Sequence, residues 1–428
     1  MVGVGDYRRR CLDDELDELL GALPAIALEG PKGVGKTATA QRRAATTVRL
    51  DEPAPRQIAE ADHTRVLSGR GPVLLDEWQR VPALWDAVRR AVDDGDPPGP
   101  FLLTGSAAPA EDPQRHSGAG RIDVLRMRPM ALSERLDLEP TVSLQALLRG
   151  GPEAVGGESP LKLADYTEEI LRSGFPGIRS LSGRARRVRL DGYVSRIIDR
   201  EFADELGQPV RRPDTLRRWM MAYAAATSTT TSLEKIRDAA THNEATPAKT
   251  TVLAYRDALV RLFILDPVDG WAPTHNHLKR LTQSAKHHLA DPALAAALLG
   301  VTEDKLLQGE GGLAALPRDG TFLGALFESL VTLSVRVFAQ AAEAQVRHLR
   351  TRSGDREVDL IVQGRAGEIV AIEVKLSATV DDAHVTHLRW LRDRLGDELR
   401  AAVVITTGPQ AYRRADGILV VPLALLGP

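Results

Sequence analysis

The stretch Gly30-Pro31-Lys32-Gly33-Val34-Gly35-Lys36-Thr37 fits the pattern G-x-x-x-x-G-K-[ST] at every fixed position. It follows the apolar run Ala25–Leu28 directly, and a helical pattern continues through Ala38 to Arg43. This order of strand, glycine-rich turn and helix predicts a phosphate-binding loop, in which backbone N–H groups surround a phosphate. The alternative is a chance glycine turn, which the flanking strand and helix patterns disfavour.

Each residue type in this loop has a chemical task. Gly30, Gly33 and Gly35 allow the backbone to approach phosphate oxygens. Lys36 is expected to reach the β- and γ-phosphates, and the Thr37 hydroxyl to ligate Mg²⁺. The residues from Gly30 to Ala38 are therefore predicted to bind ATP, with Mg²⁺ as the cofactor.

Two acids, Asp76 and Glu77, follow the apolar run Val73–Leu75. Asp76 is predicted to help hold Mg²⁺, and Glu77 to polarise the water that attacks the γ-phosphate. Acids often follow apolar strands, so this interpretation depends on the phosphate-binding loop upstream.

A third apolar run, Phe101–Leu103, leads into Thr104 and Ser106. Both hydroxyls are predicted at the carboxyl edge of a parallel sheet, where such sheets bind ligands, although a simple turn is the alternative. Arg121 precedes a further strand at Ile122–Met127. It is a candidate arginine finger, acting within its own chain or on a second copy, and otherwise one of many surface arginines.

Length and composition set limits on the class of protein. The 428 residues predict two or three domains, and 43% hydrophobic residues are ordinary for a globular protein. Lys and Arg number 56 and Asp and Glu 58, so a nucleic acid would have to bind a local patch. Only nine of the 56 are lysine, and a lysine kept in so arginine-rich a chain can have a task that arginine cannot perform.

The single cysteine, Cys11, excludes an intramolecular disulfide and a cysteine-based zinc site. The N-terminus lacks the apolar core of a signal peptide, and no run is expected to reach the ~20 apolar residues that cross a bilayer. These features predict a cytoplasmic protein without a membrane partner.

The segments Tyr7–Leu20, GPKGVGKT, VLLDEWQRVP, LLTGSAA and SGAGRIDVLRMRPMALSE together resemble bacterial and archaeal AAA-type ATPases with a conserved uncharacterised C-terminal region. In that family the acid pair is followed by glutamine and proline, like Gln79 and Pro82, and the third strand ends in a threonine-glycine-serine sensor. Trp78 departs from the family, where an aliphatic residue is usual, and this affects packing rather than chemistry.

The middle of the chain begins after a Gly- and Pro-rich linker at residues 140–165. One helical face there is basic, or else a solvated surface neutralised by Asp191 and Glu201; its arginines are Arg184, Arg186, Arg187, Arg189, Arg196 and Arg200. Three helical patterns and a strand follow, at Leu216–Ala226, Leu233–Ala240, Lys249–Leu262 and Phe263–Asp266. This order resembles a winged helix-turn-helix, whose third helix would offer Lys249, Thr250, Arg256 and Arg261 to DNA; internal scaffold or protein docking is the alternative.

The last 145 residues are predicted to form a helix, Phe322–Ala339, and four strands, with a helix at Ala383–Leu395 before the fourth. The arrangement resembles the restriction-endonuclease core, the PD-(D/E)XK fold. That resemblance makes Asp359 and Glu373 ligands of Mg²⁺, with Glu328 at the edge of the site and Lys375 positioning or deprotonating a water. The alternatives are a charged, solvated strand face and a binding scaffold that does not cut.

The predicted fold class is α/β, with three domains. Residues 1–145 form a doubly wound P-loop ATPase domain, residues 146–284 a helical, winged-helix-like domain, and residues 285–428 a restriction-endonuclease-like domain. The predicted function is ATP hydrolysis coupled to action on nucleic acid. The alternative is a nucleotide-controlled switch that binds a protein partner and has an inert C-terminal domain. ATP is the expected ligand; DNA and a second copy of the chain are the candidate partners.

Overall fold

The computed structural model describes residues 7–95, 99–105, 120–136, 139–150, 155–206, 212–241, 247–273, 283–308, 322–351 and 354–428. The chain divides into two compact units. Unit 1 comprises Met1–Arg128, Glu201–Gln208 and Ala258–Ile264. Unit 2 comprises Pro129–Arg200, Pro209–Asp257 and Leu265–Pro428, so most of the predicted middle region shares one unit with the C-terminal region.

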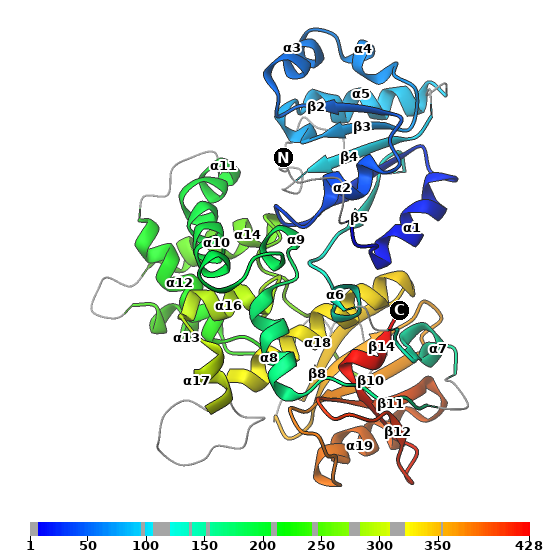
Figure 1. Cartoon of the computed structure of the whole chain (residues 1–428), viewed down its shortest axis with the longest axis vertical. Coiled ribbons are helices and arrows are strands. Elements are labelled where there is room, and N and C mark those ends of the chain that lie inside the picture. The colour runs from blue at the N-terminus through cyan, green and yellow to red at the C-terminus, as the bar shows by residue number, and fades with distance from the viewer. Residues whose placement is uncertain are drawn as a thin grey trace. The chain divides into compact units, whose positions relative to one another are not determined.

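Unit 1 is built on a parallel five-stranded sheet in the order β2-β3-β4-β1-β5 (Figure 1). The central strands β1, β3 and β4 are buried along their whole length, which is why they read as continuous apolar runs. This parallel sheet confirms the α/β class predicted for the N-terminal region. The strands are β1 (Ala25–Glu29), β2 (Thr46–Arg49), β3 (Val73–Asp76), β4 (Phe101–Gly105) and β5 (Asp123–Arg126).

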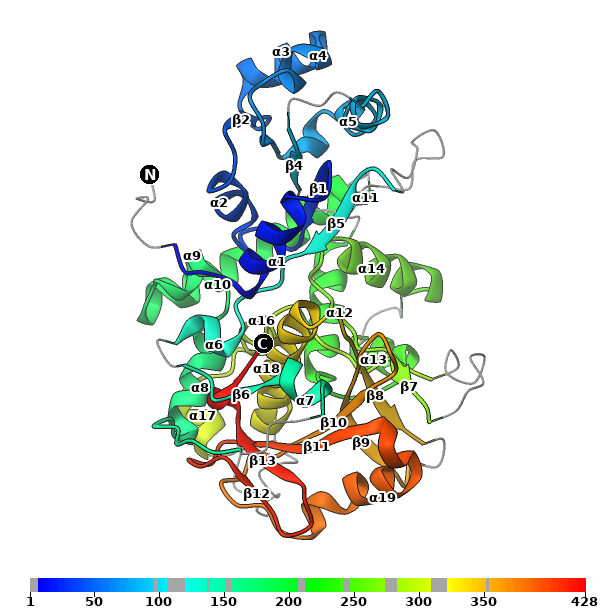
Figure 2. The same ribbon diagram turned by 90° about the vertical axis from the view of Figure 1, so that its right-hand side faces the viewer.

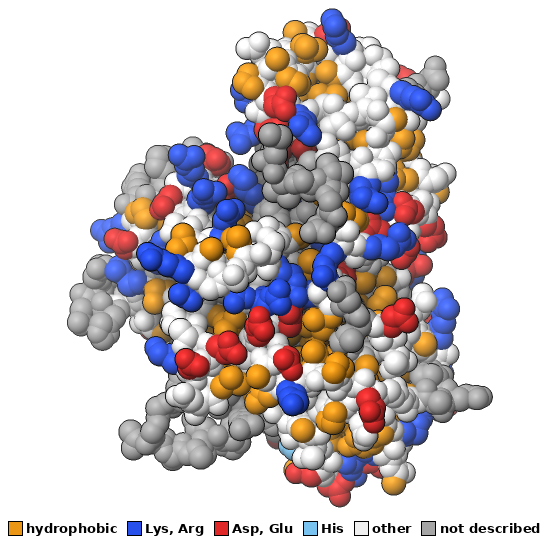
Figure 3. All heavy atoms as spheres, viewed as in Figure 1, with side chains coloured by type: hydrophobic (Ala, Val, Ile, Leu, Met, Phe, Trp, Pro, Cys, Tyr) orange, Lys and Arg blue, Asp and Glu red, His pale blue; other side chains and the backbone are white. Residues whose placement is uncertain are grey.

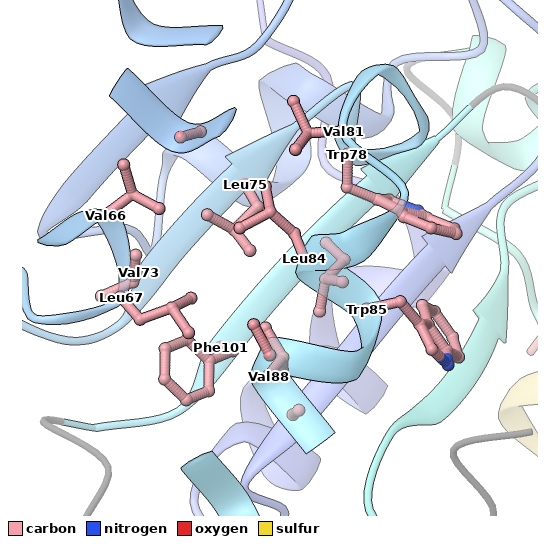
Figure 4. Packing of buried hydrophobic residues seen from close by; sticks show 14 of the residues in the cluster. Val66, Leu67, Val73, Leu75, Trp78, Val81, Leu84, Trp85, Val88 and Phe101 are labelled. Carbon is pink, nitrogen blue, oxygen red and sulfur yellow. The ribbon is translucent and has the colours of Figure 1, made fainter. Parts of the chain in front are cut away.

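Helices cover both faces of this sheet. On one face, α3 (Pro53–Ala61), α4 (His63–Leu67) and α5 (Ala83–Asp93) enclose an apolar core. Figure 4 shows Leu84 and Val88 of α5 packed beside Leu75 and Phe101 of the sheet. The short helix α2 (Lys36–Gln41) packs against β1, β3 and β4, and α1 (Cys11–Leu20) precedes β1.

The middle of the chain is helical, as predicted. The three helices of the expected winged helix-turn-helix are present as α12 (Pro213–Ala225), α13 (Leu233–Ala239) and α14 (Lys249–Arg261). The strand predicted at Phe263–Asp266 is wrong: Phe263 has a left-handed φ of 58°, which breaks an extended run, and only Leu265 forms an isolated bridge. The other helices here are α8 (Leu163–Arg172), α9 (Pro176–Arg179), α10 (Gly183–Arg196), α11 (Phe202–Leu206), α16 (Pro292–Leu299) and α17 (Glu303–Gln308).

The C-terminal part of unit 2 contains a mixed seven-stranded sheet in the order β12-β13-β11-β10-β9-β8-β7. Strands β10, β11 and β13 run parallel, whereas β9 is antiparallel to both β8 and β10. Figures 1 and 2 show α18 (Phe322–Ala341) and α19 (Thr386–Leu395) on opposite sides of this sheet. The strands are β7 (Gly270–Trp271), β8 (Gln345–Arg350), β9 (Glu357–Gln363), β10 (Ile369–Val374), β11 (Leu399–Thr406), β12 (Tyr412–Arg413) and β13 (Leu419–Pro422).

Two short segments close unit 2. Strand β6 (Val142–Ser143), which precedes α7 (Leu144–Leu148), pairs in parallel with β14 (Leu426–Gly427). The helix α6 (Leu132–Arg135) is joined to α18 by a hydrogen bond from the Leu132 amide to Ser334 Oγ at 3.1 Å. Residues near both sequence ends of unit 2 therefore contribute to one packed structure.

Helix α18 is long and apolar enough to cross a membrane by length and composition alone, which corrects the expectation that no run approaches that length. Its most apolar window is 67% buried inside unit 2, and it carries Glu328 and Arg336, which both form ion pairs. The apolar composition is accounted for by packing, since α18 contacts α7, α8, α16 and the strands β8 and β9.

Candidate functional site

The phosphate-binding loop connects β1 to α2, and its backbone conformation requires glycine, as Gly30 and Gly35 illustrate. A Cβ at Gly30 would lie 2.1 Å from the carbonyl oxygen of Met127, so no larger residue fits there. Gly35, which caps α2, has a φ of 113°, in the region that favours glycine. The glycines of the sequence pattern therefore lie where the backbone of the loop requires them.

Lys36 is held inside this loop. Its Nζ donates hydrogen bonds to the carbonyl oxygens of Gly30 at 2.7 Å and Pro31 at 3.0 Å, and the residue is 6% exposed. Burial lowers the pKa of Lys36 to about 8, although the carboxylates of Glu77 and Asp76 act in the opposite direction. A phosphate in the loop would offer this ammonium a stronger, charge-assisted partner than the neutral carbonyls do.

Three oxygen-bearing side chains meet at the carboxyl edge of the sheet, next to the loop. Thr37 Oγ1 donates to Asp76 Oδ1 at 2.7 Å, and Thr104 Oγ1 donates to the same oxygen at 2.5 Å. The register that places Asp76 of β3 opposite Thr104 of β4 brings them together. Hydroxyl and carboxylate oxygens are ligands that Mg²⁺ accepts, so these residues fit the predicted ion. Ser106 lies outside the described residues.

Glu77 directly follows β3 in a left-handed conformation, with a φ of 56°. Such a conformation costs about 1–3 kcal/mol, and functional sites often contain residues strained in this way. Gln79 Nε2 donates to Glu77 Oε2 at 2.5 Å, which fixes the carboxylate. Trp78 is 1% exposed and packs on Trp85 with ring centroids 4.9 Å apart, so this departure from the resembling family serves packing, as expected.

The segment before β1 supports the loop, a role that the sequence did not reveal. The guanidinium of Arg10, a residue 5% exposed, donates to the carbonyl oxygens of Val34 at 3.2 Å and Arg128 at 2.7 Å. Tyr7 donates from its hydroxyl to Asp13, and Asp13 pairs with Arg43 at 2.8 Å just beyond α2. These contacts connect the segment before β1 to the middle of the phosphate-binding loop, at Val34, and to the chain that follows α2.

Glu29 is a second residue that the sequence analysis missed. It is the last residue of β1, immediately before the loop, and is 9% exposed. Burial raises the pKa of Glu29 to about 7, against the opposing effects of Arg126 and Lys36. The sequence did contain one indication of this residue, because Glu29 is the single acid at the end of an otherwise apolar strand.

The Glu29 carboxyl group should make stability depend on pH. The folded state binds a proton more readily than the unfolded state, so stability falls as the pH rises from about 4.5 to about 7. We expect Glu29→Gln to raise the free energy of unfolding of the nucleotide-free protein by about 1–3 kcal/mol at pH 8, and by clearly less at pH 5. Urea unfolding at the two pH values measures this difference.

Glu60→Gln on the exposed side of α3 is the matched control, for which no pH-dependent gain is expected. An equal gain from Glu29→Gln at both pH values would show that the benefit comes from packing and not from the charge.

Arg121 lies at the opposite edge of the sheet from the phosphate-binding loop. Asp123, two residues later, is in register with Ile26 near the start of β1, whereas the loop follows the end of β1. Six residue positions along a strand span about 20 Å, beyond the reach of one side chain. Arg121 Nε is paired with Asp93 at 2.7 Å. An arginine finger within the same chain therefore does not fit, and a role on a second copy stays a prediction.

The predicted C-terminal metal site is organised around a lysine instead. The Nζ of Lys286 lies 2.8 Å from Glu328 Oε1, 3.1 Å from Asp359 Oδ1 and 3.3 Å from Glu357 Oε1. Lys286 is 1% exposed. One buried ammonium thus occupies the centre of three carboxyl groups that come from α18 and β9.

The remaining predicted ligands are also engaged by protein groups. The second oxygen of Asp359 accepts the Val374 amide at 2.9 Å, and Glu373 Oε2 pairs with Lys375 at 3.2 Å. Across the described ranges, no group of three or more His, Cys, Asp or Glu side chains is arranged to hold a metal ion. Glu328, Asp359 and Glu373 therefore do not fit the expected Mg²⁺ site, because lysine ammonium groups take the positions beside them.

Burial and neighbouring charges shift the pKa values of the acids in this cluster in different directions. Burial raises the pKa of Glu328 to about 8 despite Lys286, and burial together with the Asp359 charge raises the pKa of Glu373 well above its usual range. Burial acts in the same direction on Asp359, but Lys286, Lys375 and the Val374 amide outweigh it and lower its pKa. Asp359 is thus the carboxylate that stays charged opposite Lys286.

Comparison with known proteins assigns the N-terminal region. Residues 23–136 match the model of an AAA domain, residues 163–305 that of a domain of unknown function (DUF8612), and residues 323–426 that of another (DUF4143). The loop geometry and the first match together define a Walker-type AAA ATPase domain, which binds nucleotide. Neither later match carries a function, and a PD-(D/E)XK domain is not among them.

Two whole-chain relatives are the uncharacterized proteins Mb2031c of Mycobacterium bovis and Rv2008c of Mycobacterium tuberculosis. Each is 27% identical over 422 residues, which cover 97% of this chain and 83% of the relative. The Walker-type ATPase PABY2304 of Pyrococcus abyssi is a structural neighbour with a TM-score of 0.39 and 17% identity, covering 69% of this chain and 99% of that chain.

Proposed function

We propose that unit 1 hydrolyses ATP, with Lys36 on the β- and γ-phosphates, Thr37 and Asp76 as ligands of Mg²⁺, and Glu77 orienting the attacking water. The observation that carries this proposal is the meeting of Thr37, Thr104 and Asp76 through one carboxylate oxygen beside the loop that holds Lys36. When bound, Mg²⁺ would neutralise charge on the phosphate oxygens.

Glu77 is the residue best placed to orient water. Gln79 holds its Oε2, while its Oε1 accepts no hydrogen bond from another described residue. A carboxylate fixed at one oxygen and available at the other can accept a proton or orient water without rearrangement. The left-handed backbone at Glu77 sets the direction of this side chain.

We further propose that nucleotide turnover acts on nucleic acid through the basic face of α10. Arg189 and Arg196 lie seven residues apart, which places them on one side of α10, and Arg200 follows in the π-helical segment Ile197–Glu201. All three are exposed, and none forms an ion pair within the described ranges. Figure 3 shows Lys and Arg side chains gathered in the region of α10.

One of the two acids in the neutralised-surface alternative is engaged elsewhere. Glu201, one of the acids expected to neutralise the arginines, pairs with Lys32 at 2.6 Å instead. Unpaired guanidinium groups in a row suit the phosphates of a nucleic-acid backbone, which they contact through charge-assisted hydrogen bonds.

A second candidate function is the nucleotide-controlled switch that binds a protein partner. The contacts of Lys286 favour it, because a lysine lies among the carboxyl groups that were predicted to hold the metal ion for cutting. On this hypothesis ATP hydrolysis is the only chemistry of the chain, and unit 2 transmits the nucleotide state to a partner.

ATP turnover with and without nucleic acid separates the two candidates. We expect single- or double-stranded DNA to raise kcat several-fold at 50 mM salt and less at 200 mM salt. The triple variant Arg189→Ala, Arg196→Ala, Arg200→Ala should lose the stimulation and keep basal turnover. Arg365→Ala, which removes an exposed arginine already paired with Glu343, is the control. Basal turnover that no DNA or RNA stimulates would leave the switch as the function.

A further inference from the structure

The side chain of Lys286 enters its cluster from a fixed backbone. The Lys286 amide donates to the Val268 carbonyl at 2.8 Å, and the Val268 amide donates to the Lys286 carbonyl at 2.9 Å. Two residues earlier, the Ser284 carbonyl oxygen lies 2.9 Å from His348 Nε2. Because this backbone is anchored, the fold of unit 2 sets the position of the ammonium.

Three carboxyl groups surround the ammonium of Lys286. Glu328 approaches from α18, and Glu357 and Asp359 approach from β9, all within 3.3 Å of one nitrogen. Lys286 also bridges two separately matched regions, because it lies in residues 163–305 whereas the three acids lie in residues 323–426.

We infer that Lys286 is the resident cation of this cluster, and that its ammonium takes the place that a divalent metal ion would otherwise fill between Glu328, Glu357 and Asp359. The native unit 2 then neither needs nor admits a metal ion there. The same carboxylates form a metal site only when the ammonium is removed. This inference concerns unit 2 and is independent of the proposed ATP hydrolysis.

Distance and charge explain why the ammonium excludes a metal ion. Nitrogen-to-oxygen distances of 2.8–3.3 Å suit ammonium–carboxylate contacts, whereas Mg²⁺ requires oxygens at about 2.0–2.1 Å. A metal ion could enter only if Lys286 left, and that would break three contacts of a buried charge at once. Removal of the side chain leaves both the negative charge and the space that an ion with bound water would use.

Binding of Mn²⁺ to the nucleotide-free full chain tests the inference. All proteins carry Asp76→Asn, so that the predicted Mg²⁺ ligand in unit 1 does not contribute. Electron paramagnetic resonance counts bound Mn²⁺, and thermal unfolding is followed from zero to 1 mM Mn²⁺. For otherwise wild-type protein we expect no bound Mn²⁺ and no shift in the melting temperature.

Lys286→Ala is expected to melt at a lower temperature without metal, to bind one Mn²⁺ per chain, and to regain about 5 °C or more at 1 mM Mn²⁺. Adding Asp359→Asn should abolish that binding. Lys286→Gln, which keeps the side-chain length and removes the charge, serves if the alanine variant does not fold, and the same Mn²⁺ response is expected from it.

Two results would overturn the inference. One is a Mn²⁺ ion bound to the protein with native Lys286 that Asp359→Asn removes, which would show that the ammonium does not exclude metal. The other is a folded Lys286→Ala or Lys286→Gln protein that neither binds Mn²⁺ nor gains stability from it, which would show that the three acids do not form a cation site.

Discussion

Replacing Lys36 by alanine is expected to lower ATP turnover by about three orders of magnitude and to weaken nucleotide binding. The reason is the position of its ammonium, which is buried and held by the carbonyl oxygens of Gly30 and Pro31 within the loop. Without it, the charge that develops on the transferred phosphate loses its fixed cationic partner. Steady-state phosphate release and equilibrium binding of a fluorescent nucleotide measure the two effects.

Lys32→Ala provides the comparison within the same loop. The Lys32 side chain is half exposed and pairs with Glu201, so its loss removes a surface ion pair and leaves the backbone N–H groups in place. We expect a change of a few-fold at most. Turnover by Lys36→Ala equal to that of the wild type would contradict the assignment of the loop.

Glu77→Gln is expected to bind ATP with near-normal affinity and to hydrolyse it at least about 100-fold more slowly. Glutamine keeps the size of the side chain and a hydrogen-bonding oxygen, but it cannot accept a proton from water. The Gln79 contact orients the carboxylate, so Gln79→Ala should lower turnover by a smaller factor. Single-turnover hydrolysis and nucleotide retention on a desalting column separate chemistry from binding.

The competing explanation of Glu77 is a structural one, because its left-handed backbone lies in a turn that Trp78 anchors to the core. If Glu77→Gln failed to retain nucleotide, or unfolded at a much lower temperature, the residue would hold the turn and not the water.

Much of unit 1 could be predicted because its signals are local. The phosphate-binding loop is a contiguous pattern, and the buried strands of a parallel sheet read as apolar runs whose carboxyl ends carry Asp76 and Thr104. Strand pairing then brings those ends together without any further information. Strand pairing also argues against Arg121 as a finger within its own chain. It places the start of β5 at the edge of the sheet opposite the phosphate-binding loop.

Contacts between distant residues were not predictable in this way. Lys286 contacts Glu328 and Asp359, which are 42 and 73 residues away in the sequence. No sequence pattern near Lys286 predicts these contacts. The scarcity of lysine was the one available signal. It applies to Lys36 and Lys375, which lie in motifs, and equally to Lys286, where a compact ammonium fits a space that a planar guanidinium would not fill.

The residues around Phe263 and in α18 show a second reason why the sequence did not predict the structure. Three apolar residues after a helix, Phe263–Leu265, are typical of a strand, but the left-handed φ of Phe263 turns the chain instead. Likewise, an apolar helix of 20 residues has the composition of a membrane span and of a core helix alike, and only its packed neighbours distinguish the two.

The pairing of β6 with β14 cannot form until the end of the chain has been synthesised. Val142 and its partner Leu426 are 284 residues apart, so at about 5–20 residues per second the ribosome needs roughly 15–60 s to deliver the second strand after the first. Throughout that interval the edge of β6 has no strand to pair with, while unit 1 already has all of its own strands. A chaperone that acts on the nascent chain could therefore bind the unpaired edge of β6 during that interval.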